Sequence, residues 1–311
     1  MRTLLTHLPI LGPLLIRVCQ IPAVRWMIDE YRLRKRYGWR SPMSVVLPNS
    51  HSPLFLNPNE QRSRRVLLCH AKGQPRLKSI WHCAITTLKP LIVLDVGANY
   101  GEFTFAERYP DSKRVIAIEA NTELKPWLLQ SWEHHPEKEK ITLEFAIAAE
   151  SSGESRSFFI NSYSSGRSSA VKRQTDTWAE QQSSTVALDD LVVDIDLQEA
   201  AVVFKIDVEG YEAQVMSGMC RLLSLPKYVL GLIEFNSLFI QHAGKDPEEF
   251  LQFLARYFSI VALPHGSSYV RLDNASLSQL RELTGNHDVE LDLVLLSHMD
   301  LLPILDDSPN N

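Results

Sequence analysis

The sequence predicts an α/β fold built on a mostly parallel sheet with helices on both faces. Two apolar runs, 91–94 and 202–206, have the length and composition of strands that are buried on both sides. Between residues 91 and 147, strand-like runs alternate with helix-compatible segments, which is typical of a parallel sheet. Each of the two buried runs is followed by acidic residues and glycine, which indicates a ligand site at the carboxyl edge of the sheet.

The order of elements follows from periodicity and turn composition. Before the core we expect a helix over 23–37, a loop over 38–60, a short strand at 66–69 and a helix over 77–88. The core elements are then expected as strand 91–96, helix 101–109, strand 114–119, helix 122–134, strand 141–147, strand 202–206, helix 211–223, strand 228–235, helix 247–258, strand 258–263, a less regular strand near 269–271 and a final strand over 291–296. The serine-rich segment 151–184, with a hairpin arm at 157–160, is expected to form a lid or a loop that contacts the acceptor.

The first strand ends in a glycine turn that differs from a dinucleotide fingerprint. The spacing is Asp95-x-Gly97-x-x-x-Gly101, and Asn99 stands where G-x-G-x-x-G needs its second glycine. An acid at this position suits a cationic amine better than a pyrophosphate. Glu119 ends the second strand, where a carboxylate can accept both hydroxyls of a ribose. Together these residues predict a site for an adenosine with an amino-acid tail, which is S-adenosylmethionine.

The second signal is the segment that follows the other buried run. Lys205 and Asp207 lie two residues apart and therefore share a face of their strand. A lysine in a buried strand needs a charged partner, and Asp95 and Glu234 are the candidates from the flanking strands. Asp207 and Glu209 lie at the carboxyl end, where ligands bind in open α/β sheets.

These two motifs resemble the FkbM family of S-adenosylmethionine-dependent methyltransferases. Residues 93–101 are similar to the opening of that family, and Lys-x-Asp-x-Glu-Gly at 205–210 is similar to its second signature. The resemblance covers 91–240 and implies a class I, Rossmann-like fold with a seven-stranded sheet. It also implies O-methylation of a hydroxyl on a sugar, glycolipid, polyketide or related small molecule. The alternatives are N-methylation and a non-catalytic scaffold that keeps the cofactor fold.

The motifs and the resemblance together give the expected site residues. The catalytic set is Asp207, Glu209 and Glu234, with Asp207 preferred as the base that takes the acceptor's proton. The cofactor-binding set surrounds the strand ends and comprises Asp95, Gly97, Ala98, Asn99, Gly101, Glu119, Ala120, Ala146 and Asp207. A divalent cation held by the acids is a less favoured alternative, because the sequence shows no full ligand set.

Charge divides the chain into a basic and an acidic part. Residues 1–90 contain 15 Lys and Arg against 3 Asp and Glu, whereas residues 91–311 contain 17 against 34. We expect the basic part to dock on the acidic domain, with contact to an anionic membrane surface as the alternative. We expect no nucleic-acid partner, because the core is acidic and the basic part carries no recognised motif.

The expected division is a partly helical extension over 1–80, an S-adenosylmethionine-binding domain over 81–300 and a tail over 301–311. The apolar run 8–19 is too short to span a bilayer. The four cysteines lack C-x-x-C spacing, which favours free thiols in a reducing compartment over structural zinc. We therefore expect a cytoplasmic protein, with association at the cytoplasmic face of a membrane as a possibility.

Overall fold

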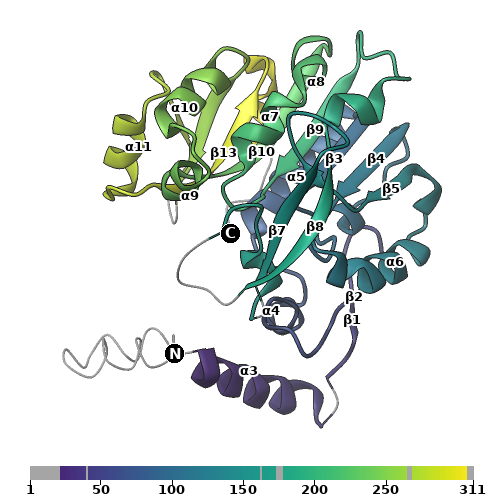
Figure 1. The fold of residues 1–311 in the computed structure, drawn as a ribbon. Coiled ribbons are helices and arrows are strands. Elements are labelled where there is room, and N and C mark those ends of the chain that lie inside the picture. Colours follow the sequence, from purple (N-terminus) through teal and green to yellow (C-terminus); the bar gives the residue numbers. More distant parts are fainter. Residues whose placement is uncertain (1–21, 40, 162, 173–177, 265–267, 307–311) are drawn as a thin grey trace.

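The computed structural model describes residues 22–39, 41–161, 163–172, 178–264 and 268–306, and its centre is an eight-stranded sheet (Figure 1). From one edge to the other the strands are β12 (Val270–Arg271), β11 (Ser259–Leu263), β13 (Glu290–Leu296), β10 (Tyr228–Asn236), β9 (Ala201–Ile206), β3 (Ile92–Val96), β4 (Arg114–Ile118) and β5 (Ile141–Glu144). The prediction of a mostly parallel sheet is confirmed. The resemblance implied seven strands, and the eighth is the two-residue β12, which lies within the less regular strand expected near 269–271.

The direction of winding changes in the middle of the sheet. From β3 the chain proceeds outward through β4 and β5, and it then returns to place β9 and β10 on the other side of β3. All neighbouring pairs among these five strands are parallel, whereas β13 runs antiparallel between β10 and β11. The carboxyl ends of β3 and β9 therefore lie together at the switch point, where open α/β sheets bind their ligands.

Alternation along β3 explains why its apolar run is continuous. Ile92 and Leu94 belong to the apolar cluster on one face of the sheet, and Val93 belongs to the cluster on the other face. All five residues of the strand are buried. A strand covered on both faces needs apolar side chains at nearly every position, and this is the signal that the sequence carries.

Helices cover both faces of the sheet (Figure 1). The first face is covered by α7 (Glu212–Ser217), α8 (Cys220–Ser224), α9 (Ser237–His242), α10 (Pro247–Ala255) and α11 (Leu277–Thr284). The second face is covered by α4 (Gln61–Cys69), α5 (Pro75–Leu88), α6 (Lys125–Glu133) and α12 (Pro303–Asp306). The helix α3 (Pro22–Tyr37) packs against α4, with a hydrogen bond of 2.7 Å from Gln61 Nε2 to Asp29 Oδ2.

Four expected elements are wrong in type or length. The strand expected over 141–147 ends at Glu144, and Ile147–Ala148 form a separate strand, β6. Residues 66–69 belong to helix α4 and not to a strand, because the Glu60 carboxylate caps a helix that begins at Gln61. The helix expected over 101–109 is reduced to a single 3₁₀ turn over Thr104–Ala106. The helix expected over 211–223 is two short helices, α7 and α8, interrupted between residues 217 and 220.

Two hairpins lie outside the central sheet. The arm expected at 157–160 is the centre of β7 (Ser155–Asn161), which pairs antiparallel with β8 (Trp178–Val186), and β8 also pairs with the short β6 (Ile147–Ala148). The segment expected as a loop over 38–60 contains the small hairpin β1 (Ser44–Val46) and β2 (Pro53–Phe55). In Figure 1 the β7–β8 hairpin lies in front of the central sheet.

Residues on both sides of position 80 share one apolar core. Leu54 and Leu67 belong to the same buried cluster as Val93, and so does Ile304 near the end of the described chain. The division at 80 and 300 stays a prediction, and in the described residues these segments pack as one body with the sheet. None of the described helices combines the length and apolar character that a membrane span requires.

Candidate functional site

A pocket of about 980 Å³, including its open mouth, lies at the carboxyl ends of the central strands. Its walls come from the turns after β3, β4 and β9, from Glu234 within β10, from residues 146–148 before β7, and from the serine-rich segment. Of the expected site residues, nine line this pocket: Gly97, Ala98, Asn99, Glu119, Ala120, Ala146, Asp207, Glu209 and Glu234. Asp95 and Gly101 do not line it.

Gly97 brings the two sequence motifs into contact. Its φ is +77°, and a Cβ at this position would lie 1.9 Å from the carbonyl oxygen of Asp207. Only glycine allows the turn after β3 to pass so close to the end of β9. Residues far apart in sequence are thereby held in one wall of the pocket.

Glu119 is held by backbone donors on both of its oxygens. The N–H of Asn99 donates to Oε2 and the N–H of Asn121 donates to Oε1, each at 2.7 Å. Burial nevertheless raises the pKa of Glu119 to about 7, against the lowering effect of these hydrogen bonds. The carboxyl group therefore titrates near neutral pH at a position where it lines the pocket.

Asp95 lies behind the pocket wall and organises the turn from there. Its Oδ2 accepts hydrogen bonds from the Thr104 N–H at 3.1 Å and from the Thr104 hydroxyl at 2.6 Å. Its Oδ1 is buried without a hydrogen-bond partner among the described residues. Burial raises the pKa of Asp95 although the neighbouring Lys205 favours the ionised form.

Lys205 neutralises the acids of this region. It stands opposite Asp95 in the pairing of β9 with β3, and its Nζ lies 3.0 Å from Asp207 Oδ2. Burial disfavours its ammonium, but the combined charges of Asp207, Asp95 and Glu234 outweigh that effect and raise its pKa. The two expected partners are thus electrostatic neighbours, while the direct ion pair is with Asp207.

Three carboxyl groups converge at the ends of β9 and β10. Asp207, Glu209 and Glu234 each offer one oxygen, and these oxygens lie within 4.8 Å of one another. Burial, and after it the charges of Asp207 and Glu209, raise the pKa of Glu234 well above its ordinary value. Glu209 has a φ of +59°, a strained backbone conformation for this residue type. Glu234 can accept a proton, or the three carboxylates together can hold a divalent cation.

The turn that carries these acids is supported by Glu212. Its Oε1 accepts hydrogen bonds of 3.1 Å from the N–H groups of Val208 and Gly210. Gly210 has a φ of +108°, and a Cβ there would lie 2.8 Å from the carbonyl oxygen of Phe239. The glycine of the second motif is therefore required by backbone geometry.

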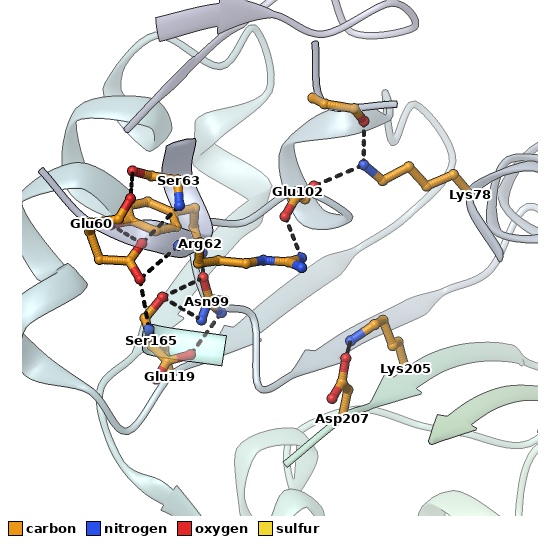
Figure 2. A network of polar contacts seen from close by, with 12 residues as sticks. Glu60, Arg62, Ser63, Lys78, Asn99, Glu102, Glu119, Ser165, Lys205 and Asp207 are labelled. Carbon is orange, nitrogen blue, oxygen red and sulfur yellow. Dashed lines mark hydrogen bonds and ion pairs between the residues drawn. The ribbon is translucent and has the colours of Figure 1, made fainter. Parts of the chain in front are cut away.

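Sequence reasoning missed the part of the pocket that comes from residues before 91 and from the turn after Gly101. Arg62, Gln74 and Glu102 all line the pocket. Arg62 Nη2 donates to Glu102 Oε1 at 2.5 Å, and Lys78 Nζ lies 3.1 Å from Glu102 Oε2 (Figure 2). Burial alone would raise the pKa of Glu102, but Arg62 and Lys78 hold it below its ordinary value. The basic part is thus docked on the acidic domain at this point, as favoured from the charge pattern.

Glu60 joins three segments beside the pocket (Figure 2). Its carboxylate accepts from the N–H groups of Arg62 and Ser63 at 2.9 and 2.8 Å, which caps α4. It also accepts from the N–H of Ser165 at 2.8 Å and from the Tyr100 hydroxyl at 3.3 Å. The serine-rich segment is therefore fixed to α4 and to the first glycine turn. Five of its residues line the pocket: Phe158, Ser165, Gly166, Ser168 and Ala170.

The sheet order and the position of the pocket define a class I methyltransferase fold. A family model described as the Methyltransferase FkbM domain matches residues 95–259, which is more than half of the chain. The chain belongs to this family, and it is a methyltransferase. The fold, the family and the enzyme class expected from the sequence are thereby confirmed.

Solved structures with a similar arrangement share little sequence with the chain. The methyltransferase FkbM from Methylobacillus flagellatus KT is 14% identical, with a TM-score of 0.37 over 89% of this chain and 60% of that chain. The O-methyltransferase TomG from Streptomyces achromogenes, in complex with SAM, is 10% identical, with a TM-score of 0.38 over 71% and 80% of the two chains. An O-methyltransferase from Bacillus cereus in complex with SAH is 10% identical, with a TM-score of 0.39 over 72% and 81%. A search of curated proteins finds no match.

Proposed function

We propose that the protein is an S-adenosylmethionine-dependent O-methyltransferase that acts on the hydroxyl of a sugar, glycolipid, polyketide or related small molecule. The observation that carries this proposal is the joining of two sets of groups in one pocket. Gly97 and Glu119 lie at the ends of β3 and β4, and the three converging carboxyl groups lie at the ends of β9 and β10. The first set suits a nucleoside and the second suits proton transfer.

The pocket residues fit the parts of the cofactor. Glu119 can accept the ribose hydroxyls, because each of its oxygens has a free lone pair beside the backbone hydrogen bond. The adenine can pack against apolar residues of the pocket lining, which are Ala120, Ala146, Ile147, Ala148 and Phe158. Asp95 supports the turn through Thr104 and does not line the pocket. S-adenosylmethionine supplies the electrophilic methyl group.

Glu234 is better suited than Asp207 to take the acceptor's proton. An alcohol must lose its proton as its oxygen accepts the methyl group, and a base whose pKa lies near the working pH does this best. Asp207 already accepts a hydrogen bond from the Lys205 ammonium, with 3.0 Å between Nζ and Oδ2, so one of its oxygens is occupied. Glu234 has a raised pKa and lies beside Asp207 and Glu209 in the pocket. We therefore assign the base to Glu234 and a positioning role to Asp207.

Calorimetry with S-adenosylmethionine and NAD tests the cofactor. We expect binding of the first and none of the second, because Asn99 occupies the place of the second glycine that a pyrophosphate needs. Incubation with methyl-labelled S-adenosylmethionine and a panel of sugars and glycolipids, followed by mass spectrometry, shows whether oxygen or nitrogen receives the methyl group. Binding of NAD alone, or methylation of nitrogen alone, would contradict the proposal.

The assignment of the base makes a kinetic prediction. Glu234→Gln is expected to lower kcat by about 10²–10⁴ while leaving the Kd of S-adenosylhomocysteine within a few-fold of the parent. In the parent, kcat is expected to rise with pH until Glu234 is ionised. Asp207→Asn is the matched variant, with a smaller loss of kcat. A larger loss in Asp207→Asn would return the role of base to Asp207, as first expected.

A chelator separates proton transfer from metal catalysis at the same carboxylates. The arrangement of Asp207, Glu209 and Glu234 can accommodate a cation, although we do not favour one. Under the proposed mechanism EDTA leaves kcat unchanged. Loss of activity in EDTA, with recovery in magnesium, would instead make the three residues ligands that lower the pKa of the acceptor.

We propose in addition that the enzyme works in a reducing compartment, at the cytoplasmic face of a membrane. Cys69 and Cys220 are exposed free thiols. Met27 and Tyr31 are exposed one turn apart on α3, which ends in the basic residues Arg34, Lys35 and Arg36. An exposed apolar and basic surface of this kind suits an anionic lipid surface and a lipid-linked acceptor.

A further inference from the structure

Arg62 reaches the pocket from outside the segment that matches the FkbM domain, which begins at residue 95. It belongs to the first turn of α4, which the Glu60 carboxylate caps. In Figure 2 its side chain extends from α4 between Asn99 and Glu119 on one side and the Lys205–Asp207 pair on the other. The guanidinium thus lies between the nucleoside end of the pocket and the acidic end.

The guanidinium has hydrogen-bonding capacity to spare. An arginine carries five N–H donors. The hydrogen bond found for its terminal nitrogens is the one from Nη2 to Glu102 at 2.5 Å. Its Nε is buried and has no hydrogen-bond partner within the described part of the chain. A buried donor without a partner is costly, so a ligand acceptor at this point would be stabilised.

The charges around the pocket favour an anionic group at Arg62 and nowhere else among the described residues. Five acids line the pocket: Glu102, Glu119, Asp207, Glu209 and Glu234. Two cations line it, and one of them, Lys205, donates to Asp207. S-adenosylmethionine has two positive groups, the sulfonium and the ammonium, and one carboxylate. Its positive groups can lie near the acids only if its carboxylate binds a cation that has free donors.

We propose that Arg62, with Gln74 as a further polar residue of the pocket lining, binds the carboxylate of the methionine part of the cofactor. The inference rests on the proposed use of S-adenosylmethionine. Arginine matches a carboxylate because its planar fork can donate two parallel hydrogen bonds. Glu102 and Lys78 then act as positioning residues that fix the orientation of the guanidinium. The segment before the family domain thereby completes the cofactor site.

The test compares S-adenosylhomocysteine with its decarboxylated analogue, which keeps the amine and the adenosine. Calorimetry on the parent is expected to show about tenfold or tighter binding of S-adenosylhomocysteine. Arg62→Gln is expected to lose about tenfold or more for that ligand and to keep the Kd of the analogue within about twofold. The ratio of the two Kd values should therefore be close to one in Arg62→Gln.

Two further variants control for a purely structural effect. Arg65→Gln removes an exposed arginine of the same helix that does not line the pocket, and it is expected to keep the parent's ratio of Kd values. Arg62→Lys keeps the charge without the fork and is expected to lose part of the ratio, which provides the test if Arg62→Gln does not fold. Equal weakening of both ligands, or an unchanged ratio in Arg62→Gln, would overturn the inference. A parent that binds neither ligand would instead overturn the proposed function itself.

Discussion

At the scale of the residue, Gly97 has the strictest requirement in the site. An alanine there would have to place its Cβ 1.9 Å from the Asp207 carbonyl oxygen, in a backbone conformation with φ of +77°. Gly97→Ala is therefore expected to lower the free energy of unfolding by about 2 kcal/mol or more, since the backbone itself must move. It should also weaken cofactor binding. Urea denaturation and calorimetry measure the two effects.

Gly153 is the matched control for Gly97. Its φ is +85°, but a Cβ there would meet no atom within 4 Å. Gly153→Ala should therefore cost about 1 kcal/mol for the left-handed conformation alone and leave cofactor binding unchanged. If the two variants lose the same stability, the close approach to Asp207 is not what demands glycine at position 97.

Glu119 predicts a pH dependence of nucleoside binding. Its pKa is raised to about 7, so it becomes fully ionised only above neutral pH. The ionised form accepts the ribose hydroxyls on both oxygens, so affinity should rise with pH through about 7 and then level off. For 5′-methylthioadenosine, which has no amino-acid tail, we expect binding about tenfold weaker at pH 6 than at pH 8.5.

Variants at two glutamates check the origin of that dependence. Glu119→Ala should weaken binding about tenfold or more, and Glu119→Gln should make binding independent of pH in this range. Glu212 also has a pKa of about 7 because of burial, but it does not line the pocket. Glu212→Gln should therefore keep the parent's pH profile. A parent whose affinity is flat between pH 6 and pH 8.5 would contradict the role of Glu119.

At the scale of the element, one cap connects α4 with the segment over the pocket. Glu60 binds the first N–H groups of α4 and also the N–H of Ser165. Glu60→Ala should lower the free energy of unfolding by about 1–2 kcal/mol through the lost cap. Because Ser165 and Arg62 both line the pocket, cofactor affinity should fall as well.

Another helix of similar length provides the control for this prediction. Asp246 caps α10, where its Oδ1 accepts from the Glu248 N–H at 2.8 Å, and neither residue lines the pocket. Asp246→Ala should lose a similar amount of stability and keep the parent's Kd for S-adenosylhomocysteine. Equal affinities in the two variants would show that Glu60 is only a helix cap. Denaturation and calorimetry on the same samples give both values.

The sequence predicts the elements whose environment is uniform and misses those that depend on a distant contact. The strands β3 and β9 are buried on both faces, so every position carries the apolar signal. Residues 66–69 of helix α4 are expected as a strand because Val66 and Leu67 form a short apolar run. The Glu60 cap that begins this helix also binds Ser165, a contact that the sequence does not show. Helix periodicity is weak over nine residues.

The pocket residues before position 91 show the same limit. The sequence contains Arg62, Arg64 and Arg65 in one short stretch, and nothing in their types distinguishes them. Their roles depend on the face of α4 that each arginine occupies and on the residues that it contacts. Arg62 enters the pocket, whereas Arg64 forms an ion pair with Glu30 and lies 3.7 Å from the centroid of the Trp26 ring.

At the scale of the whole molecule, the basic part of the chain has two separate uses. Arg62 and Lys78 are docked on Glu102, and Arg64 binds α3 to α4 through Glu30. The basic residues in the last turn of α3 are exposed, and Arg34 lies 5.0 Å from the ring of Trp39. Internal docking therefore accounts for the pocket side, and the outer side of α3 remains available to an anionic surface.

That outer surface predicts membrane binding that depends on both charge and apolar contact. Met27, Tyr31 and Trp39 are 70%, 66% and 87% exposed. The parent should float with vesicles that contain anionic lipid and not with zwitterionic vesicles, and salt should weaken the effect. Replacing the three residues by serine should abolish flotation, because basic residues alone hold a surface only weakly. Val193, 71% exposed elsewhere, is the control, and Val193→Ser should float as the parent does. A parent that stays unbound with anionic vesicles at low salt would remove the membrane from the function and leave α3 with packing on α4 alone.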